Sequence, residues 1–173
     1  MLTDTKELRA RARKHIEEGA ITEDYQANTA IIVDLLNKAL ATELVCVLRY
    51  RYHYFMAKGI NASSVAQEFL EHADQELQHA DKIAERIVQL GGKPDLNPNT
   101  LTERSHAEYN TPSSLKEMIK ENLIAERIAI ESYREMINFI SHSDPTSLRI
   151  LEEILAVEEE HAEELASLND DIN

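Results

Sequence analysis

The sequence contains few of the residues that break helices or cross-link chains. It has four Gly, four Pro, no Trp and one Cys in 173 residues. The lone Cys46 excludes an internal disulfide, and the sequence has no Cys-x-x-Cys pair to hold zinc or a rubredoxin-type iron. Alternating strand-like runs are missing too, whereas Ala, Glu, Leu, Ile, Lys and Arg dominate. The composition therefore predicts an all-α protein.

Long apolar runs and positive charge are also scarce. The opening MLTDTKELRA is polar with no apolar run behind it, so we expect neither a signal peptide nor contact with a membrane, and a cytoplasmic location. The formal net charge of −14 makes DNA an unfavourable partner and fits a protein that gathers cations. Acidic residues that only keep a helical bundle soluble are the simpler explanation of the charge taken alone.

Glycine, proline and hydrophobic periodicity divide the chain into one short and four long helices. We expect residues 1–28 to be an N-terminal helical extension and residues 29–173 to form a four-helix bundle. The extension contains a helix over 4–18, capped by Thr3 or Asp4 and ended by Gly19. The long helices are expected over 29–58, 63–90, 112–141 and 145–168, and the last two open with the Thr-Pro and Asp-Pro signals of a cap followed by proline.

Residues 91–111 form a long connection with two Gly and two Pro. At about 3.3 Å per residue the segment can run the length of the bundle, so the third long helix can start at the opposite end. A short helix over 101–109 fits on the way.

The extension is the one basic part of an acidic chain. A DNA-touching or partner-docking arm is one interpretation, and a helix packed on the bundle or on a neighbouring subunit is the favoured one. The basic residues are Lys6, Arg9, Arg11, Arg13 and Lys14.

Two Glu-x-x-His motifs, at 76–79 and 158–161, carry the functional prediction. Residues three apart share one helix face, so each pair offers a carboxylate and an imidazole to the same point. The preceding long helix of each half carries one Glu on its apolar stripe, and the offsets from it to the motif, 33 and 32 residues, indicate an internal duplication. From the turns near 61 and 143, all four carboxylates lie about 22 to 27 Å along their helices, at mid-height. The candidate ligands are Glu43, Glu76, His79, Glu126, Glu158 and His161.

A metal site explains why four glutamates would lie in a bundle core. Burying carboxylates without partners costs several kcal/mol each, and two divalent metal ions balance the four charges. Carboxylate and imidazole ligands favour iron first and manganese second. A single Glu-x-x-His motif in an acidic helix usually lies on the solvent-exposed face. Two such motifs at core positions, together with two further Glu, are not expected by chance.

Other chemically capable residues lack such a pattern. Tyr50 and Tyr133 each follow their Glu by seven residues, and core packing and a role beside the metals both remain open. Cys46 is expected to be a small core residue. Surface or packing roles are expected for the remaining histidines, which are His15, His53, His72, His106 and His142.

Over residues 29–168 these motifs resemble the ferritin-like di-iron carboxylate proteins, most closely the bacterioferritin type of site. The resemblance implies a ferritin-like four-helix bundle with a long crossover between its second and third helices. It also implies two irons per subunit, with Glu43 and His79 on one, Glu126 and His161 on the other, and Glu76 and Glu158 as bridges. Bacterioferritins bind haem through a Met after the second-helix Glu; here that residue is Leu77, so no haem is expected.

The short stretch after His161, 12 residues, leaves no room for the fifth helix that closes 24-subunit ferritin shells. With the long crossover this resembles the Dps-like ferritins, so a 12-subunit shell is favoured over 24. The expected function is oxidation of Fe(II) by peroxide or oxygen and storage of Fe(III) mineral in the shell. The alternatives are a di-metal oxidase or manganese catalase without storage, a DNA-coating protein, and a purely structural bundle.

Overall fold

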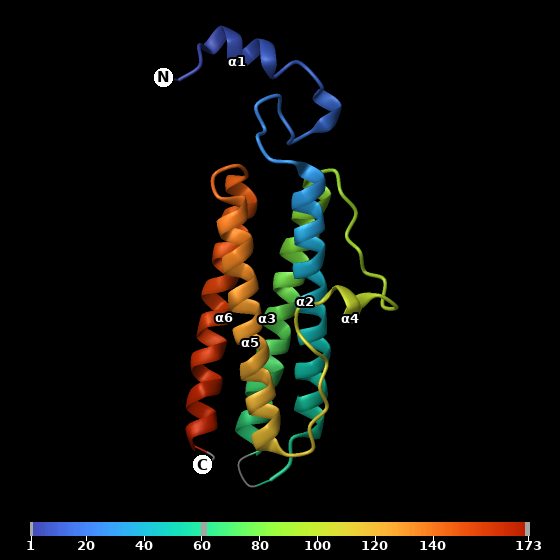
Figure 1. Cartoon of the computed structure of the whole chain (residues 1–173), viewed down its shortest axis with the longest axis vertical. Coiled ribbons are helices and arrows are strands. Elements are labelled where there is room, and N and C mark those ends of the chain that lie inside the picture. The colour runs from blue at the N-terminus through green and yellow to red at the C-terminus, as the bar shows by residue number, and fades with distance from the viewer. Residues whose placement is uncertain (1, 60–61, 172–173) are drawn as a thin grey trace.

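The computed structural model describes residues 2–59 and 62–171, and in this part of the chain every regular element is a helix. The four long helices lie side by side as a bundle (Figure 1), with α2 packed mainly on α3 and α5 mainly on α6. Their bounds are α2 Thr29–Met56, α3 Ala62–Gln89, α5 Leu115–Ile140 and α6 Pro145–Asp171. The prediction of an all-α four-helix bundle is confirmed. The predicted turn near residue 61 lies outside the described residues.

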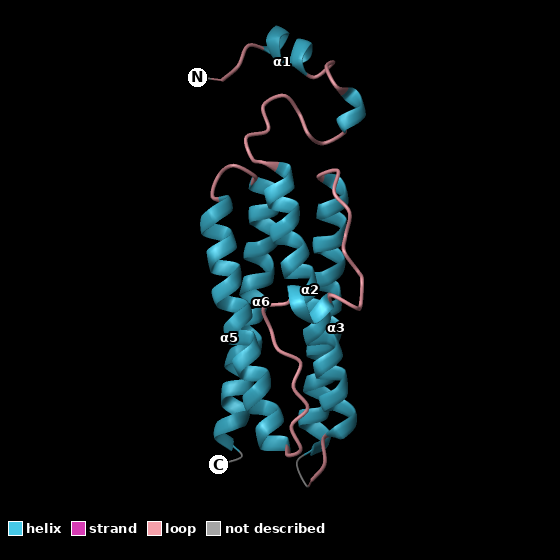
Figure 2. Ribbon diagram, turned by 45° about the vertical axis from the view of Figure 1, so that its right-hand side comes forward, coloured by secondary structure: helices cyan, strands magenta, loops and turns pink. Residues whose placement is uncertain are grey.

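The long crossover joins α3 to α5 from opposite ends of the bundle, as expected. Figure 2 shows the segment running down the side of the molecule, interrupted by the short helix α4 (Leu101–Arg104). That helix is shorter than the predicted 101–109, because the backbone of Ser105 is extended and ends the helix. The crossover is anchored to α2, since the Arg49 guanidinium donates to the carbonyl of Glu108 at 2.9 Å.

Local capping explains where the helices begin. The prediction that α5 opens at Thr111 and Pro112 is wrong by three residues: Ser114 is the cap, and its hydroxyl oxygen accepts from the backbone N–H of Glu117 at 3.2 Å. Ser-x-x-Glu is a capping box, which stabilises this start over the upstream one. The prediction for α6 is confirmed, because Asp144 accepts from the N–H of Ser147.

The N-terminal helix is shorter than predicted. α1 spans Thr5–Arg11, with Asp4 as the cap, and a separate 3₁₀ turn, η1, spans Ile16–Glu18. Neither element buries a residue, and in Figure 1 α1 lies beyond the end of the bundle. A short helix without packing partners is marginal in water, which explains why the predicted 4–18 helix does not continue.

The two larger apolar clusters among the described residues leave a polar layer between them, and a third, small cluster lies where α4 packs on α2. One of the two larger clusters includes Leu36, Ile83 and Leu151, and the other includes Phe69 and Leu165, all of them fully buried. The buried glutamates and histidines of the candidate ligand set occupy the space between these two. No helix in the described ranges is both long and apolar enough to span a membrane.

Candidate metal centre

The six candidate ligands come together from all four long helices. Each of them is at most 4% exposed, although Glu and His are seldom so deeply buried without partners. Their ligand atoms form two groups, each with all atoms within 4.8 Å of one another. The first group is Glu43, Glu76, His79 and Glu158, and the second is Glu76, Glu126, Glu158 and His161.

Three carboxylates surround the imidazole of His79. Its Nδ1 lies 3.2 Å from Oε2 of Glu43, 3.6 Å from Oε2 of Glu76 and 3.0 Å from Oε1 of Glu158. Glu43 comes from α2 and Glu158 from α6, so residues far apart in the sequence complete the group that the local motif starts.

The imidazole of His161 has a matching environment. Its Nδ1 lies 3.5 Å from Oε1 of Glu76, 4.0 Å from Oε1 of Glu126 and 3.9 Å from Oε2 of Glu158. Glu76 and Glu158 therefore turn one oxygen toward each histidine. Glu43 faces only His79, and Glu126 faces only His161; we call these two the one-sided glutamates.

Hydrogen bonding leaves atoms of this cluster unsatisfied. Among the described residues, four buried cluster atoms lack a hydrogen-bond partner: Glu76 Oε1, Glu126 Oε2, Glu158 Oε1 and His161 Nδ1. Buried polar atoms without partners are rare and costly. All four are lone-pair donors of the kind that bind a cation, so the clusters are compatible with a dinuclear metal site.

Two tyrosines hold the one-sided glutamates. The hydroxyl of Tyr133 donates to Oε1 of Glu43, and that of Tyr50 donates to Oε1 of Glu126. Both tyrosines are fully buried. The sequence left open whether these tyrosines only pack in the core or also lie beside the metal site. Each hydroxyl contacts and orients the carboxylate of a candidate ligand, which favours the second role.

Protonation in the metal-free protein follows from burial and crowding. Burial, with repulsion from neighbouring carboxylates, raises the pKa of Glu43 and Glu158 well above the usual range and also raises the pKa of Glu126. Burial acts in the same direction on Glu76, but hydrogen bonds from its neighbours outweigh it and lower that pKa. Burial opposes the charge on His79, yet its carboxylate partners raise its pKa to about 10. Metal ions must therefore displace protons from this cluster.

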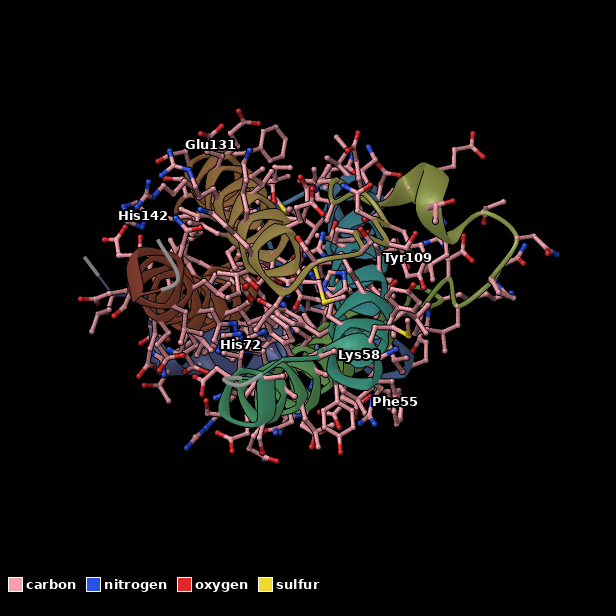
Figure 3. The ribbon with its side chains drawn as sticks, turned by 90° about the horizontal axis from the view of Figure 1, so that it is seen from below. Phe55, Lys58, His72, Tyr109, Glu131 and His142 are labelled. Carbon is pink, nitrogen blue, oxygen red and sulfur yellow. The ribbon has the colours of Figure 1, made fainter. Side chains whose placement is uncertain are left out.

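Two residues that contact His161 were missed by the sequence patterns: Gln75, whose Oε1 lies 2.7 Å from Nε2 of His161, and His72. His72 is the more deeply buried of the two. It is 1% exposed, and its ring stacks on that of His161 with centroids 3.9 Å apart. Burial, together with the neighbouring His161, lowers the pKa of His72 to about 4. In Figure 3, which views the bundle from one end, His72 lies in the region between α3 and α6. The sequence pattern that could have identified His72 is its position on the same helix face as Glu76, one turn earlier, with Glu68 one turn before that.

The remaining candidates take structural positions. Cys46 is buried in an apolar cluster, as expected. His53 is a buried packing residue whose Nδ1 lies 3.0 Å from Oδ1 of Asn122. His15, His106 and His142 are exposed.

The fold and the cluster define a class of helical proteins with a carboxylate-rich site inside a four-helix bundle. A family model described as "Ferritin-like domain" matches residues 33–173. The chain belongs to this family.

Relatives of two kinds share this family. A solved structure of the bacterioferritin-related protein from Bacteroides fragilis, described as a dodecameric thioferritin, is 34% identical, covers 85% of this chain and 89% of its own, and superposes with a TM-score of 0.82. Bacterioferritin from Rhodobacter capsulatus is 29% identical over 78% of this chain and 80% of its own length. A nutrient stress-induced DNA-binding protein from Synechococcus sp. is also 29% identical, with 80% of each covered. The protein is thus a homologue of both bacterioferritins and Dps proteins.

Proposed function

We propose that the protein is a ferroxidase that oxidises Fe(II) with hydrogen peroxide or oxygen and stores the Fe(III) produced. The observation that carries the proposal is the arrangement of Glu76 and Glu158. Each directs one carboxylate oxygen toward His79 and the other toward His161. Two Fe(II) ions bound in the two groups would therefore share two carboxylates and lie close enough to react with one oxidant.

Pairing the substrate ions matters because peroxide accepts two electrons and each Fe(II) supplies one. Two Fe(II) become two Fe(III), the O–O bond breaks, and two hydroxide ions form. A site for a single iron would transfer one electron and release a hydroxyl radical. The paired site therefore consumes the oxidant without forming radicals.

The proposed ligand roles follow the two groups. Glu43 and His79 hold one Fe(II), Glu126 and His161 hold the other, and the two bridging glutamates contact both. The four carboxylates balance the charge of two divalent ions, so the buried site is neutral when loaded. Oxygen and nitrogen donors without thiolate favour iron, with manganese as the second choice.

Haem is not part of the proposal. The side chain that follows Glu76 is Leu77, which offers no ligand atom for a haem iron. An absorption spectrum of the purified protein without a Soret band is the expected result.

The shell is proposed by analogy with the dodecameric relative from Bacteroides fragilis. We expect twelve copies, in the cytoplasm, around a cavity that holds mineral. Residues 1–28 are proposed as an extension separate from the bundle of 29–173. Native mass and electron microscopy would measure the copy number and the hollow interior directly.

Aerobic Fe(II) oxidation by the purified protein tests the activity. Glu76→Ala removes a ligand of both ions, and His161→Ala removes a ligand of one. In each variant the initial rate should fall to the uncatalysed level. The matched control is Glu160→Ala, which removes an exposed carboxylate from the same helix as His161 and should leave the rate unchanged. Unaltered rates in both cluster variants would reject the proposal.

Assays on the same purified protein distinguish a ferroxidase from the two other enzyme classes. A manganese catalase would release oxygen from peroxide without consuming iron, and a di-metal oxidase would need an organic substrate. Rapid peroxide disproportionation by the manganese-loaded protein, with no mineral formed from Fe(II), would favour the catalase.

DNA binding is not expected, although the Synechococcus relative is named for it. Lys14 is paired with Glu23 at 2.9 Å and Arg11 with Glu7 at 3.6 Å, which reduces the positive charge of the extension. A gel-shift assay at low salt should show no retardation.

A further inference from the structure

A second cluster of ligand atoms adjoins the proposed ferroxidase centre at the edge of the bundle. Glu68 and His72 lie one turn apart on α3, and Glu164 faces them from α6. His72 Nε2 is 2.9 Å from Oε2 of Glu164 and 3.6 Å from Oε1 of Glu68. The ligand atoms of these three residues all lie within 4.8 Å of one another.

The three side chains lead from solvent to the interior. Glu164 is 42% exposed and Glu68 is 33% exposed, whereas His72 is 1% exposed. A cation from solvent can thus reach the two carboxylates directly, and the imidazole is the inner wall of the cluster.

Hydrogen bonding in this cluster needs a positive charge at one defined place. When Glu126 is charged, as it must be to hold a metal ion, the hydroxyl of Tyr50 donates its single hydrogen to Glu126 and accepts from Nδ1 of His72, which lies 3.1 Å away. When Nδ1 of a neutral imidazole carries the hydrogen, Nε2 presents a lone pair. That lone pair points at carboxylate oxygens, which are acceptors as well. Either an additional proton or a cation must lie between them.

The charge of the surroundings favours the cation. Two carboxylates from different helices converge on the neutral ring, and burial with repulsion from Glu164 raises the pKa of Glu68. A single proton leaves one of the two negative charges unbalanced. A divalent ion balances both and accepts the nitrogen lone pair as a third ligand.

We propose that Glu68, His72 and Glu164 form a third divalent-cation site, which delivers cations to the buried centre. Overlapping ligand groups connect the two places. His72 also belongs to a group with Glu126 and His161, whose ligand atoms are within 4.8 Å of one another. A cation therefore moves from the outer carboxylates to the centre without losing all protein ligands. The delivery role rests on the proposed ferroxidase function, whereas the existence of the site does not.

The number of Co(II) ions bound per chain tests the site. Co(II) is a divalent probe that is not oxidised under these conditions, and equilibrium dialysis of the assembled protein followed by elemental analysis counts it. The double variant E68Q/E164Q keeps the size and polarity of both side chains and should bind one Co(II) fewer than the unaltered protein. Circular dichroism checks that the helices are retained.

The matched control is E71Q/E163Q, which removes two exposed carboxylates from the same two helices. It should bind as many Co(II) ions as the unaltered protein. Equal binding by all three proteins would overturn the proposal and leave a proton on His72 as the explanation. Equal loss in both double variants would also overturn it, because general surface charge would then account for the binding.

A kinetic measurement separates this site from the ferroxidase centre. With Fe(II) well below saturation, E68Q/E164Q should oxidise iron about tenfold more slowly than the control, a typical effect of losing an electrostatic entry site. At saturating Fe(II) the two should converge. Absence of oxidation in every protein, with the additional Co(II) still bound, would reject the ferroxidase function but not the site. An unchanged rate at low Fe(II) would reject delivery.

Discussion

The hydroxyl of Tyr133 on α5 donates to Oε1 of Glu43 on α2, a residue 90 positions earlier in the chain. The other oxygen of the same carboxylate is thereby left to face Nδ1 of His79 at 3.2 Å. On the other side of the centre, Tyr50 likewise donates to Oε1 of Glu126, and Oε2 of Glu126 is buried without a hydrogen-bond partner. Each one-sided glutamate thus has one oxygen held by a tyrosine and one free for a cation.

Removing one of these hydroxyls should weaken one of the two metal positions. In Tyr133→Phe, the carboxylate of Glu43 loses the donor that fixes its orientation. Loss of such an orienting contact typically lowers metal affinity about 10- to 100-fold. A Co(II) titration monitored by absorption should show one weakened ion of the pair. Tyr109→Phe is the control, because Tyr109 is 44% exposed, and it should titrate like the unaltered protein.

The stability of the metal-free protein should fall as the pH rises above about 6.5, because His79, like Glu43 and Glu158, holds its proton more tightly in the folded state. The pKa of His79 is raised to about 10 in the folded state, so the folded protein binds the proton more tightly than the unfolded chain. That contribution is complete below pH 6.5 and is lost as the pH rises toward 10. The pKa values of His72 and His53 are both lowered to about 4, so as the pH falls from 6.5 to 4 their protonation opposes the stabilising effect of protonating the two glutamates.

Thermal unfolding at a series of pH values measures this decrease in stability. Saturating Mn(II) should flatten the decrease, because bound metal replaces the proton on the cluster. A decrease that is the same with and without Mn(II) would contradict this assignment.

Helix geometry explains why so much of the centre was predictable. The rise per residue places Glu43 and Glu76 at the same height on antiparallel helices, and the i, i+3 spacing aligns each Glu with its His. Those rules use only local periodicity and the positions of the turns. The structure accordingly brings all six predicted residues together, and their function as ligands is the subject of the proposed experiments.

Features that depend on distant partners were not predictable from the same rules. The local spacing places His72 one turn before Glu76, but its contacts with His161 and with Glu164, which is 92 positions away, depend on how α3 packs against α6. The start of α5 was misplaced because a capping box at Ser114 competes with the Thr-Pro signal a few residues earlier. A single sequence does not show which of two competing helix caps is the stronger. Nor does it show which residues of two distant helices face each other.

A buried ion pair at one end of the bundle should contribute strongly to stability. The guanidinium of Arg86 contacts Oδ1 of Asp144 at 2.8 Å and the hydroxyl of Ser147 at 2.9 Å. Arg86→Met would leave the buried carboxylate without its cation, which costs about 3 kcal/mol or more when one partner of a buried pair is removed. Urea unfolding of the metal-free protein should show a loss of that size.

The comparison variant for this pair is Arg134→Met. Arg134 pairs with Glu159 on the surface, where the two side chains are 57% and 47% exposed, and an exposed pair contributes at most about 1 kcal/mol. Similar losses in the two variants would show that burial does not distinguish the pairs.

The start of the crossover depends on a glycine because the chain approaches α2 closely. A Cβ atom at Gly92 would lie 2.7 Å from both methyl carbons of Val33 and 3.1 Å from Cγ2 of Ile87. Val33 is β-branched and on a helix, so its side chain has little freedom to move aside. Gly92→Ala should therefore destabilise the protein by about 1–3 kcal/mol, the usual effect of overpacking. In the double variant Gly92→Ala/Val33→Ala the new methyl gains space, so the loss should be smaller than the sum of the two single losses. Strictly additive losses in urea unfolding would show that this contact does not set the position of the crossover.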